Sequence, residues 1–402
     1  MHILIIADVY PPEVSSAANL MKELAGGFLN IGDDVTMVTS YPRHYLRENK
    51  KGISVVSEEN GIRVIRVKTL PLHNVNFIIR GISQLILPFL FFTKIKKYIN
   101  KKIDAVIVYS PPLPLGIVGK MVKNRYGAKF VLNVQDIFPQ NAIDLGILRN
   151  KLLIELFEKM EQYVYKNADA ITFNSEGGRK FLIEKKNVPE QKISTLLNWV
   201  NISEYQKFKN TSFREKYGLE NKFIFLFAGV MGPAQGLRYV IDIAERVADL
   251  DDIAFLFVGE GTEKENIKKL VKEKSISNVY FQSFVSKEEY PALVSNSDVG
   301  IVCLSAENKT PFLPGKFQGY MAAAKPIVAF LNKESDGFNL IEKATCGYAA
   351  CSDNIEEGEK IVRKIFEERG KIDELGENGF KYAKENLSLE GAVEKFCEII
   401  RK

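Results

Sequence analysis

Short apolar runs rich in β-branched and aromatic residues alternate with longer helical patterns along the 402-residue chain, and this alternation restricts the fold more than any other feature. Strands separated by helices form βαβ units and a parallel sheet. Most runs are almost continuously apolar, as expected for strands that helices cover on both faces. The expected strands are 3–7, 35–39, 64–67, 105–109, 129–134, 170–173, 193–197, 223–228, 254–258, 279–281, 299–304, 326–330 and 347–350.

The alternation runs twice, with a polar break near residues 198–213. Helical patterns fill the intervals between strands, as at 15–30, 152–166, 236–249 and 263–273. We therefore predict two doubly wound α/β domains, residues 1–200 and 201–388. A final helix is expected at 389–402, and packing back on the N-terminal domain is one arrangement for it.

Composition excludes several classes of protein and site. Hydrophobic residues make up 46% of the chain and charged residues 26%, which is unlike disordered, collagen-like or coiled-coil proteins. The four cysteines form no Cys-x-x-Cys pair and the three histidines no His-Glu-x-x-His pattern. We therefore expect reduced thiols, no metal site and no cofactor. Without a secretory leader or an apolar run of 18 residues, the sequence favours a cytoplasmic protein without a spanning helix.

The basic residues are concentrated in one half of the chain. Residues 1–200 hold 27 basic and 18 acidic side chains, whereas residues 201–402 hold 28 and 32. Lysines at 94, 96, 97, 101 and 102 directly follow the apolar stretch 77–92. The apolar density and the lysines of segment 77–102 favour an interfacial helix on an anionic bilayer, the alternative being a core helix with a basic end. No nucleic-acid reader motif accompanies the charge, so nucleic acid is not an expected partner.

Polar and glycine-rich loops follow the expected strands, where ligands of such sheets bind. Gly229 to Gly236 connects a strand to a helix, an arrangement that suits a phosphate but also serves as an ordinary turn. Gly259-Glu260-Gly261-Thr262 repeats this pattern. Lys316 lies in the first turn of a predicted helix, where a cation does not stabilise the helix. The lysine is therefore expected to bind an anion, the alternative being a solvated surface residue.

One acidic residue of the N-terminal half, Asp136, is a candidate for catalysis. Asp136 follows an expected strand, so it could position or deprotonate a hydroxyl group, or cap the following helix. Glu158 and Glu161 lie on a charged helical face and are expected to be solvated.

Five segments along the chain carry a family resemblance. They are Tyr10-Pro11-Pro12-Glu13, Phe227 to Leu237, Phe257-Val258-Gly259-Glu260-Gly261, Pro314-Gly315-Lys316 with Tyr320 to Pro326, and Ala344-Thr345-Cys346-Gly347. These segments resemble the retaining glycosyltransferases of family 4, which have the GT-B fold. The resemblance implies two Rossmann-like domains that face each other across a cleft, and it covers nearly the whole chain.

Within that family the chain is most similar to the WbuB-type N-acetyl-L-fucosamine transferases of capsule and O-antigen biosynthesis. The segments behind this similarity are Val134 to Pro139, Asn198-Trp199-Val200-Asn201 and Gly232-x-x-Gln235-Gly236. The resemblance implies donor contacts at Gly229, Met231, Gly232, Gln235, Gly236, Gly259, Gly261, Phe284, Lys316 and Gly319. It implies acceptor contacts at Tyr10, Pro12, Glu13, Ser16, Asp136 and Asn198. Asp136 and Lys316 are the expected catalytic residues, and amides of 231–235 are expected to support the donor diphosphate.

The chain also departs from the family pattern. Val230 and Gln235 stand where many members have an arginine and a lysine for the diphosphate. Pro311 and Gly319 stand where the family has a pair of glutamates, the second of which usually holds the ribose. A glycine inside a helix costs roughly 1 kcal/mol relative to alanine, so Gly319 is expected to pack closely against a neighbour, the donor being one candidate.

The resemblance implies a hexosyltransferase that moves an amino-deoxyhexose from a UDP-sugar to a polyprenyl-diphosphate-linked sugar in capsule or lipopolysaccharide biosynthesis. Its expected partners are these two substrates and, through residues 77–102, the inner face of the plasma membrane. Two alternatives remain: a nucleotide-sugar epimerase of GT-B fold, and a non-catalytic membrane-associated relative.

Overall fold

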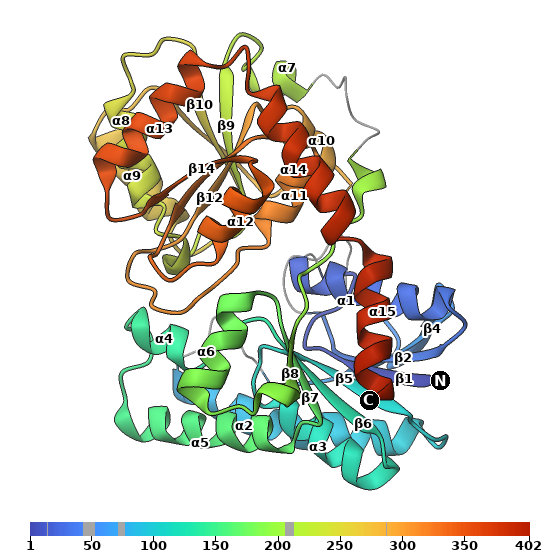
Figure 1. Ribbon diagram of the computed structural model, residues 1–402. Helices are drawn as coiled ribbons and strands as arrows, with labels where there is room; N and C mark the ends of the chain where they lie inside the picture. The colour runs from blue at the N-terminus through green and yellow to red at the C-terminus, as the bar shows by residue number, and fades with distance from the viewer. Residues whose placement is uncertain (14, 43–52, 71–76, 206–212, 287) are drawn as a thin grey trace. The chain divides into compact units, whose positions relative to one another are not determined.

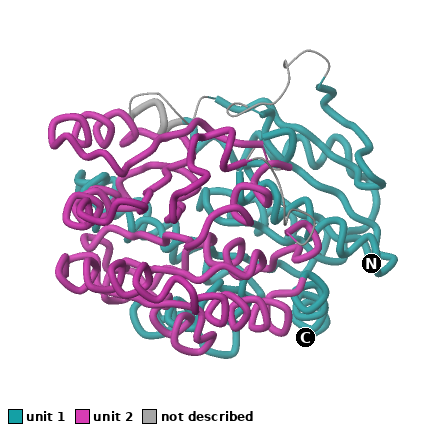
Figure 2. The backbone as a smooth tube through the Cα atoms, turned by 90° about the horizontal axis from the view of Figure 1, so that it is seen from above, with its two compact units in different colours: residues 1–197, 389–402 teal, residues 198–388 magenta. Residues whose placement is uncertain are grey.

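The computed structural model describes residues 1–13, 15–42, 53–70, 77–205, 213–286 and 288–402, and the side chains of 77–82 lie outside the description. The chain divides into two compact units (Figure 2). Unit 1 comprises residues 1–197 together with 389–402, and unit 2 comprises residues 198–388. This division lies three residues before the boundary expected at residue 200, and the C-terminal helix belongs to unit 1.

Unit 1 is built on an eight-stranded sheet with the order β3-β4-β2-β1-β5-β6-β7-β8 (Figure 1). All neighbouring strands are parallel except the pair β3 and β4. The strands are β1 His2–Ile6, β2 Asp34–Ser40, β3 Val56–Glu59, β4 Ile62–Val67, β5 Ala105–Ser110, β6 Lys129–Val134, β7 Ala170–Phe173 and β8 Ile193–Thr195.

The edge strand β3 was not expected from the sequence. It pairs antiparallel with β4 across the turn residues Asn60 and Gly61, which have φ of 52° and 79°. Asn-Gly is a strong hairpin signal, but β3 is half-exposed and reads Val-Ser-Glu-Glu. Because neither face of this edge strand is buried, its sequence lacks the apolar run that predicts the other strands.

The helices of unit 1 are α1 Ser16–Asn30, α2 Phe77–Tyr98, α3 Leu115–Tyr126, α4 Gln140–Asp144, α5 Lys151–Asn167, α6 Glu176–Lys186 and α15 Leu389–Arg401. Residues of α2, α3, α5 and α6 share one core with alternate residues of the strands, such as Leu4 and Ile6, so these helices cover the same face of the sheet. Helix α15 packs on α1, with the ring centroids of Phe28 and Phe396 6.2 Å apart. No described helix has the length and apolarity needed to cross a membrane.

Glu161 corrects one expectation for unit 1, because this residue is 1% exposed and not solvated. Its carboxylate pairs with Lys186 at 2.9 Å and accepts a hydrogen bond from the hydroxyl of Tyr165 at 3.2 Å. The residue lies on the core-facing side of α5, beside Val164, so the helix carries a buried ion pair within an otherwise apolar face.

Unit 2 is built on a six-stranded parallel sheet with the order β11-β10-β9-β12-β13-β14. Its strands are β9 Phe223–Ala228, β10 Ile253–Val258, β11 Val279–Gln282, β12 Val299–Cys303, β13 Ile327–Leu331 and β14 Gly347–Cys351. Its helices are α7 Phe213–Tyr217, α8 Arg238–Arg246, α9 Lys264–Glu273, α10 Tyr290–Ser295, α11 Lys316–Ala322, α12 Gly337–Ala344, α13 Ile355–Glu367 and α14 Asp373–Asn386.

The strand order of unit 2 reverses at β9, which has β10 on one side and β12 on the other. Such a reversal leaves a crevice at the carboxyl ends of the two strands, where ligands of open α/β sheets bind. All thirteen strands expected from the sequence are present in the two units, with ends that differ by up to two residues.

Candidate functional site

A tyrosine separates β9 from β12 at the switch point of unit 2. Strand β9 stays paired with β10 as far as Ala228, but its last pair with β12 joins Leu226 to Gly300. Tyr320 of α11 fills the gap: its hydroxyl donates to the carbonyl oxygen of Leu226 at 2.8 Å and accepts from the Ala228 amide at 3.4 Å. The side chain thus replaces the missing ladder bonds and holds the two strand ends apart.

Lys316 lies one helical turn before Tyr320, on the same face of α11. Its Nζ is 4.6 Å from the ring centroid of Phe227 and 3.4 Å from the position that a Cβ on Gly229 would take. Among the described residues, the ammonium forms no ion pair or hydrogen bond. Burial lowers its pKa to about 8, against a smaller opposing effect of the Cys303 thiol. A desolvated cation without a carboxylate partner favours an anionic ligand.

The glycines of the neighbouring loops are explained by packing between those loops. Gly259 has φ of 148°, and a Cβ there would lie 1.9 Å from the carbonyl oxygen of Gly229. A Cβ on Gly261 would lie 2.2 Å from the carbonyl oxygen of Met231. The two loops therefore continue the contact between β9 and β10 beyond the strand ends, and the close backbone approach needs no ligand.

Most amides expected to support a diphosphate already donate hydrogen bonds within unit 2. The Met231 amide donates to the carbonyl oxygen of Glu260 at 2.9 Å, and the Gln235 amide donates to that of Gly232 at 3.1 Å. The Gly232 amide donates to Oε1 of Gln235 at 3.1 Å, and Pro233 has no N–H. The expectation fails for these residues because the Met231 amide bonds to the loop after β10, and the 3-10 helix Pro233–Gln235 engages the amides of Gly232 and Gln235.

Two exposed apolar side chains lie in loops at this edge of unit 2. Val230, 51% exposed, follows β9, and Phe284, 37% exposed, follows β11. In the described part of unit 2 no other large hydrophobic residue is exposed. Because β9, β10 and β11 are adjacent, the structure collects the predicted donor residues from 229 to 284 at one edge of the sheet.

Gly319 is buried and packs against two tyrosines of unit 2. A Cβ at this position would lie 3.0 Å from the hydroxyl oxygen of Tyr290 and 3.1 Å from that of Tyr205. The close neighbour expected at this glycine is therefore this tyrosine pair. Pro311, at the first glutamate position of the family pattern, is buried as well.

Lys264 is a buried residue of this edge that the sequence reading missed. It is 5% exposed, and its ammonium donates to the carbonyl oxygens of Gly259 at 2.8 Å and Gln282 at 3.2 Å and to Glu260 at 2.7 Å. The lysine is the first residue of α9, so the signal that singled out Lys316 applied to it equally. Its carbonyl and carboxylate partners satisfy it inside the protein and tie the β10 loop to the end of β11.

In unit 1 the predicted acceptor residues Tyr10, Pro12, Glu13 and Ser16 lie between β1 and the start of α1. Tyr10 is buried, and burial raises the pKa of its hydroxyl to about 12. Arg66 was not anticipated: it is 3% exposed and donates to the carbonyl oxygen of Pro11 at 2.8 Å. The loop is thereby fixed to β4.

Asp136 follows the carboxyl end of β6, two strands from β1, so roughly 10 Å of sheet separates the two positions. Pro139, not Asp136, precedes α4 as its N-cap residue, which removes the capping interpretation. Burial raises the pKa of the Asp136 carboxyl to about 6. The remaining predicted acceptor residue, Asn198, is buried and belongs to unit 2, not to the N-terminal domain as expected.

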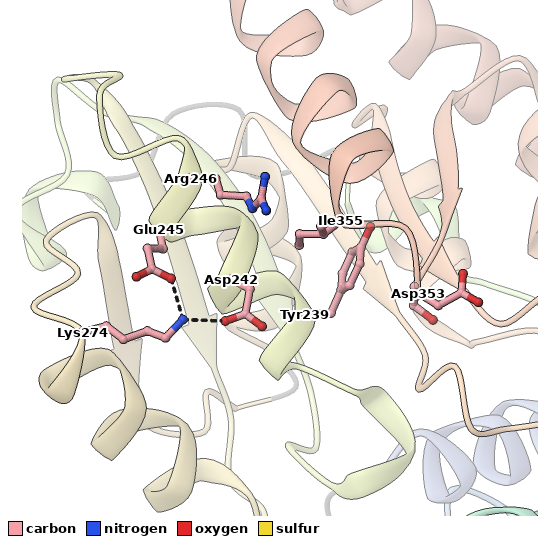
Figure 3. Close-up of a pocket in the computed structure, with 8 residues that line it drawn as sticks. Tyr239, Asp242, Glu245, Arg246, Lys274, Asp353 and Ile355 are labelled. Carbon is pink, nitrogen blue, oxygen red and sulfur yellow. Dashed lines mark hydrogen bonds and ion pairs between the residues drawn. The ribbon is translucent and has the colours of Figure 1, made fainter.

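A polar pocket of about 370 Å³ lies elsewhere on unit 2, between α8 and the end of β14 (Figure 3). Lys274 is paired there with Asp242 at 2.9 Å and with Glu245 at 2.5 Å, while Tyr239 and Asp353 line the other side. No predicted donor residue lines this pocket, and its cation already has two carboxylates. Within the described ranges, no group of three or more His, Cys, Asp or Glu side chains could hold a metal ion.

Each of the two units is similar to a known protein family. Residues 16–199 match the model described as "Glycosyl transferase 4-like domain", and residues 209–382 match "Glycosyl transferases group 1". The probable glycosyltransferase WbjE of Pseudomonas aeruginosa is 24% identical over 327 residues, or 80% of each chain. The putative colanic acid biosynthesis glycosyl transferase WcaI of Escherichia coli K12 is 24% identical over 411 residues and covers 100% of both chains.

The solved structure of Anabaena Alr3699/HepE in complex with UDP-glucose superposes with a TM-score of 0.74 at 16% identity, covering 100% of this chain and 99% of that one. The predicted fold of two Rossmann-like domains, as in GT-B glycosyltransferases, is confirmed. The chain is therefore a glycosyltransferase, built from a glycosyl transferase 4-like domain followed by a glycosyl transferases group 1 domain.

Proposed function

We propose that this glycosyltransferase moves an amino-deoxyhexose, N-acetyl-L-fucosamine, with retention from a UDP-sugar to a polyprenyl-diphosphate-linked sugar in capsule or O-antigen biosynthesis. The observation that carries the proposal is Lys316, an ammonium held over Phe227 at the switch point of unit 2 without a carboxylate partner among the described residues. A nucleotide diphosphate supplies the anion that such a site favours.

The relatives support a role in surface polysaccharide synthesis. WcaI is named for colanic acid biosynthesis, and the superposed HepE structure contains UDP-glucose. The subtype and the sugar rest on the sequence resemblance. Uridine is proposed as the base because the superposed HepE structure holds UDP-glucose, and the exposed ring of Phe284 at the end of β11 offers a stacking surface for a base.

The chemistry assigned to each residue follows from its surroundings. Lys316 binds the diphosphate and stabilises the charge that develops as the sugar–phosphate bond breaks. Asp136 positions the acceptor hydroxyl or accepts its proton, since a pKa of about 6 leaves it ionised at neutral pH yet basic enough to act. No metal or covalent protein nucleophile is assigned a step.

A lipid-linked acceptor requires access to a membrane, and the proposal assigns this contact to residues 77–102 of unit 1 at the inner face of the plasma membrane. In α2 the core-facing residues Leu87 and Phe91 are fully buried, whereas Leu85 and Phe89 are 41% and 63% exposed. The described part of this segment therefore contains both a core face and an exposed apolar face.

Nucleotide binding and transfer test the proposal. We expect UDP to raise the melting temperature of the full chain more than GDP, and UDP-N-acetyl-L-fucosamine to be consumed in the presence of a polyprenyl-diphosphate-linked acceptor. If neither nucleotide shifts the melting temperature, the donor site is misassigned and a non-catalytic role is favoured. If UDP binds but another amino-deoxyhexose is the better substrate, only the sugar is overturned.

A further inference from the structure

Helices α2 and α5 of unit 1 turn their outer sides in the same direction. Both pack on the same face of the sheet, and α3 contacts each of them. On α5 the core side carries Phe157 and Val164. The exposed side, which lies opposite on the helix, is the stripe Lys151, Leu152, Glu155, Leu156, Lys159, Gln162, Tyr163 and Lys166.

The α5 stripe exposes more apolar surface than a solvated helix face needs. Leu152 is 78% exposed, Leu156 39% and Tyr163 48%. The stripe carries three lysines and a single carboxylate, and that carboxylate, Glu155, is paired with Lys159 at 2.6 Å. The face is therefore amphiphilic along its length, with cationic side chains between the apolar ones.

The described part of α2 repeats this composition. Its outward stripe consists of Leu85, Ile86, Phe89, Thr93, Lys96 and Lys97. The sequence contains no Asp or Glu between residues 60 and 103. Of the twelve exposed large hydrophobic residues in the described part of the chain, six lie on these two stripes and a seventh, Ile147, precedes α5.

The arrangement of these side chains favours a bilayer over a protein partner. A protein interface concentrates its apolar residues in one packed core surrounded by a polar rim. On α5 the apolar and cationic side chains are interspersed, and on α2 Lys96 and Lys97 follow the apolar residues by about two helical turns. Lysines can therefore reach phosphate headgroups while neighbouring apolar side chains enter the acyl boundary. The excess of lysine further selects anionic lipids.

We propose that α5 and α2 together form the membrane-binding surface of unit 1, docked on a leaflet that contains anionic phospholipids. This extends to α5 the membrane contact that the proposed function assigns to residues 77–102. With two helices lying on the bilayer, the sheet of unit 1 runs parallel to the membrane at about one helix diameter, roughly 10–12 Å, above the headgroups. The loops at the carboxyl ends of β1 and β6 then open sideways, along the membrane surface.

Vesicle flotation of the full chain tests the proposal, with phosphatidylcholine vesicles compared with vesicles that also contain phosphatidylglycerol. The α5 variant is Leu152→Ser with Leu156→Ser, and the α2 variant is Leu85→Ser with Phe89→Ser. We expect the partition coefficient on the anionic vesicles to fall by roughly tenfold in each variant, because each removes two apolar side chains from the interface. Ile31→Ser, at a residue 56% exposed beyond the end of α1, is the matched control and should bind like the wild type.

Two results would overturn the proposal. The first is an α5 variant that binds anionic vesicles like the wild type while the α2 variant loses binding, since α2 alone then makes the contact. The second is a wild-type chain that ignores vesicles and sediments as an oligomer that the α5 variant dissociates, which makes the face a protein interface. UDP thermal shifts measured without vesicles separate this outcome from failure of the donor site, because nucleotide binding does not depend on these stripes.

Discussion

Replacing Lys316 with methionine should stabilise the protein while it weakens nucleotide binding. The methionine keeps an unbranched side chain over the ring of Phe227 and removes the charge. The ammonium is held in a desolvated position without a carboxylate partner among the described residues. The native fold therefore bears a cost that a bound diphosphate would offset under the proposed function.

The magnitude follows from the pKa of the lysine, which burial lowers from 10.5 to about 8. Because the folded pKa is the lower one, the unfolded chain binds the proton more tightly, so the cost is fully present below pH 8 and disappears as the pH rises to 10.5. A shift of this size corresponds to about 3 kcal/mol, and residual solvent contact of the partly buried side chain reduces it to roughly 1–2 kcal/mol. Loss of a charged hydrogen bond to phosphate costs about 1.5–3 kcal/mol, or roughly 10- to 150-fold in UDP affinity.

Differential scanning fluorimetry at pH 7 with and without UDP measures both effects. The unliganded Lys316→Met variant should melt roughly 2–6 °C higher than the wild type, and its shift with UDP should be much smaller. Lys272→Met, at an exposed lysine of α9, should change neither value. A Lys316→Met protein that melts lower than the wild type, or that keeps the full UDP shift, would refute the reasoning.

Two further predictions address the other loops. Asp136→Asn should lower the transfer rate by roughly 10²- to 10⁴-fold with UDP binding unchanged, and it should abolish the rise in wild-type activity expected as the pH increases through about 6; equal pH profiles for variant and wild type would exclude Asp136 as the base. Gly259→Ala should destabilise unit 2 by roughly 2 kcal/mol or more in urea unfolding, because the added Cβ meets the carbonyl oxygen of Gly229 at 1.9 Å. Gly370→Ala, where a Cβ has no neighbour within 4 Å, is its control, and equal losses in both variants would contradict the packing argument.

The hydrophobic pattern of the sequence predicts most of the strands. Each strand that helices cover is an apolar run, and the hydrophobic effect alone requires such runs to be buried, so thirteen of them could be located. The fourteenth, β3, has no apolar face to bury. Its only local signal is the turn at Asn60 and Gly61, and such a turn does not by itself determine whether the residues on either side form paired strands.

For the two lysines that begin helices, the local sequence does not predict which one is paired inside the protein. Lys264 and Lys316 each begin a helix after a strand-end loop. Lys264 is satisfied by two carbonyl oxygens and a carboxylate, whereas Lys316 lies over the ring of Phe227 and has no ion pair or hydrogen bond within the described part of the chain. No property of the local sequence separates these cases, because the partners come from other strands.

By itself the sequence determined the two α/β domains and the loops at which ligands should bind, because both follow from the spacing of apolar residues along the chain. The role of each loop residue became clear only from the fold: the glycines at 259 and 261 allow two loops to pack, Gly229 leaves room for Lys316, Gly319 makes room for two tyrosines, and Asp136 is not a helix cap. The reason is physical. Burial, charge pairing and backbone approach depend on neighbours that are distant in the chain and become adjacent only when the strands pair.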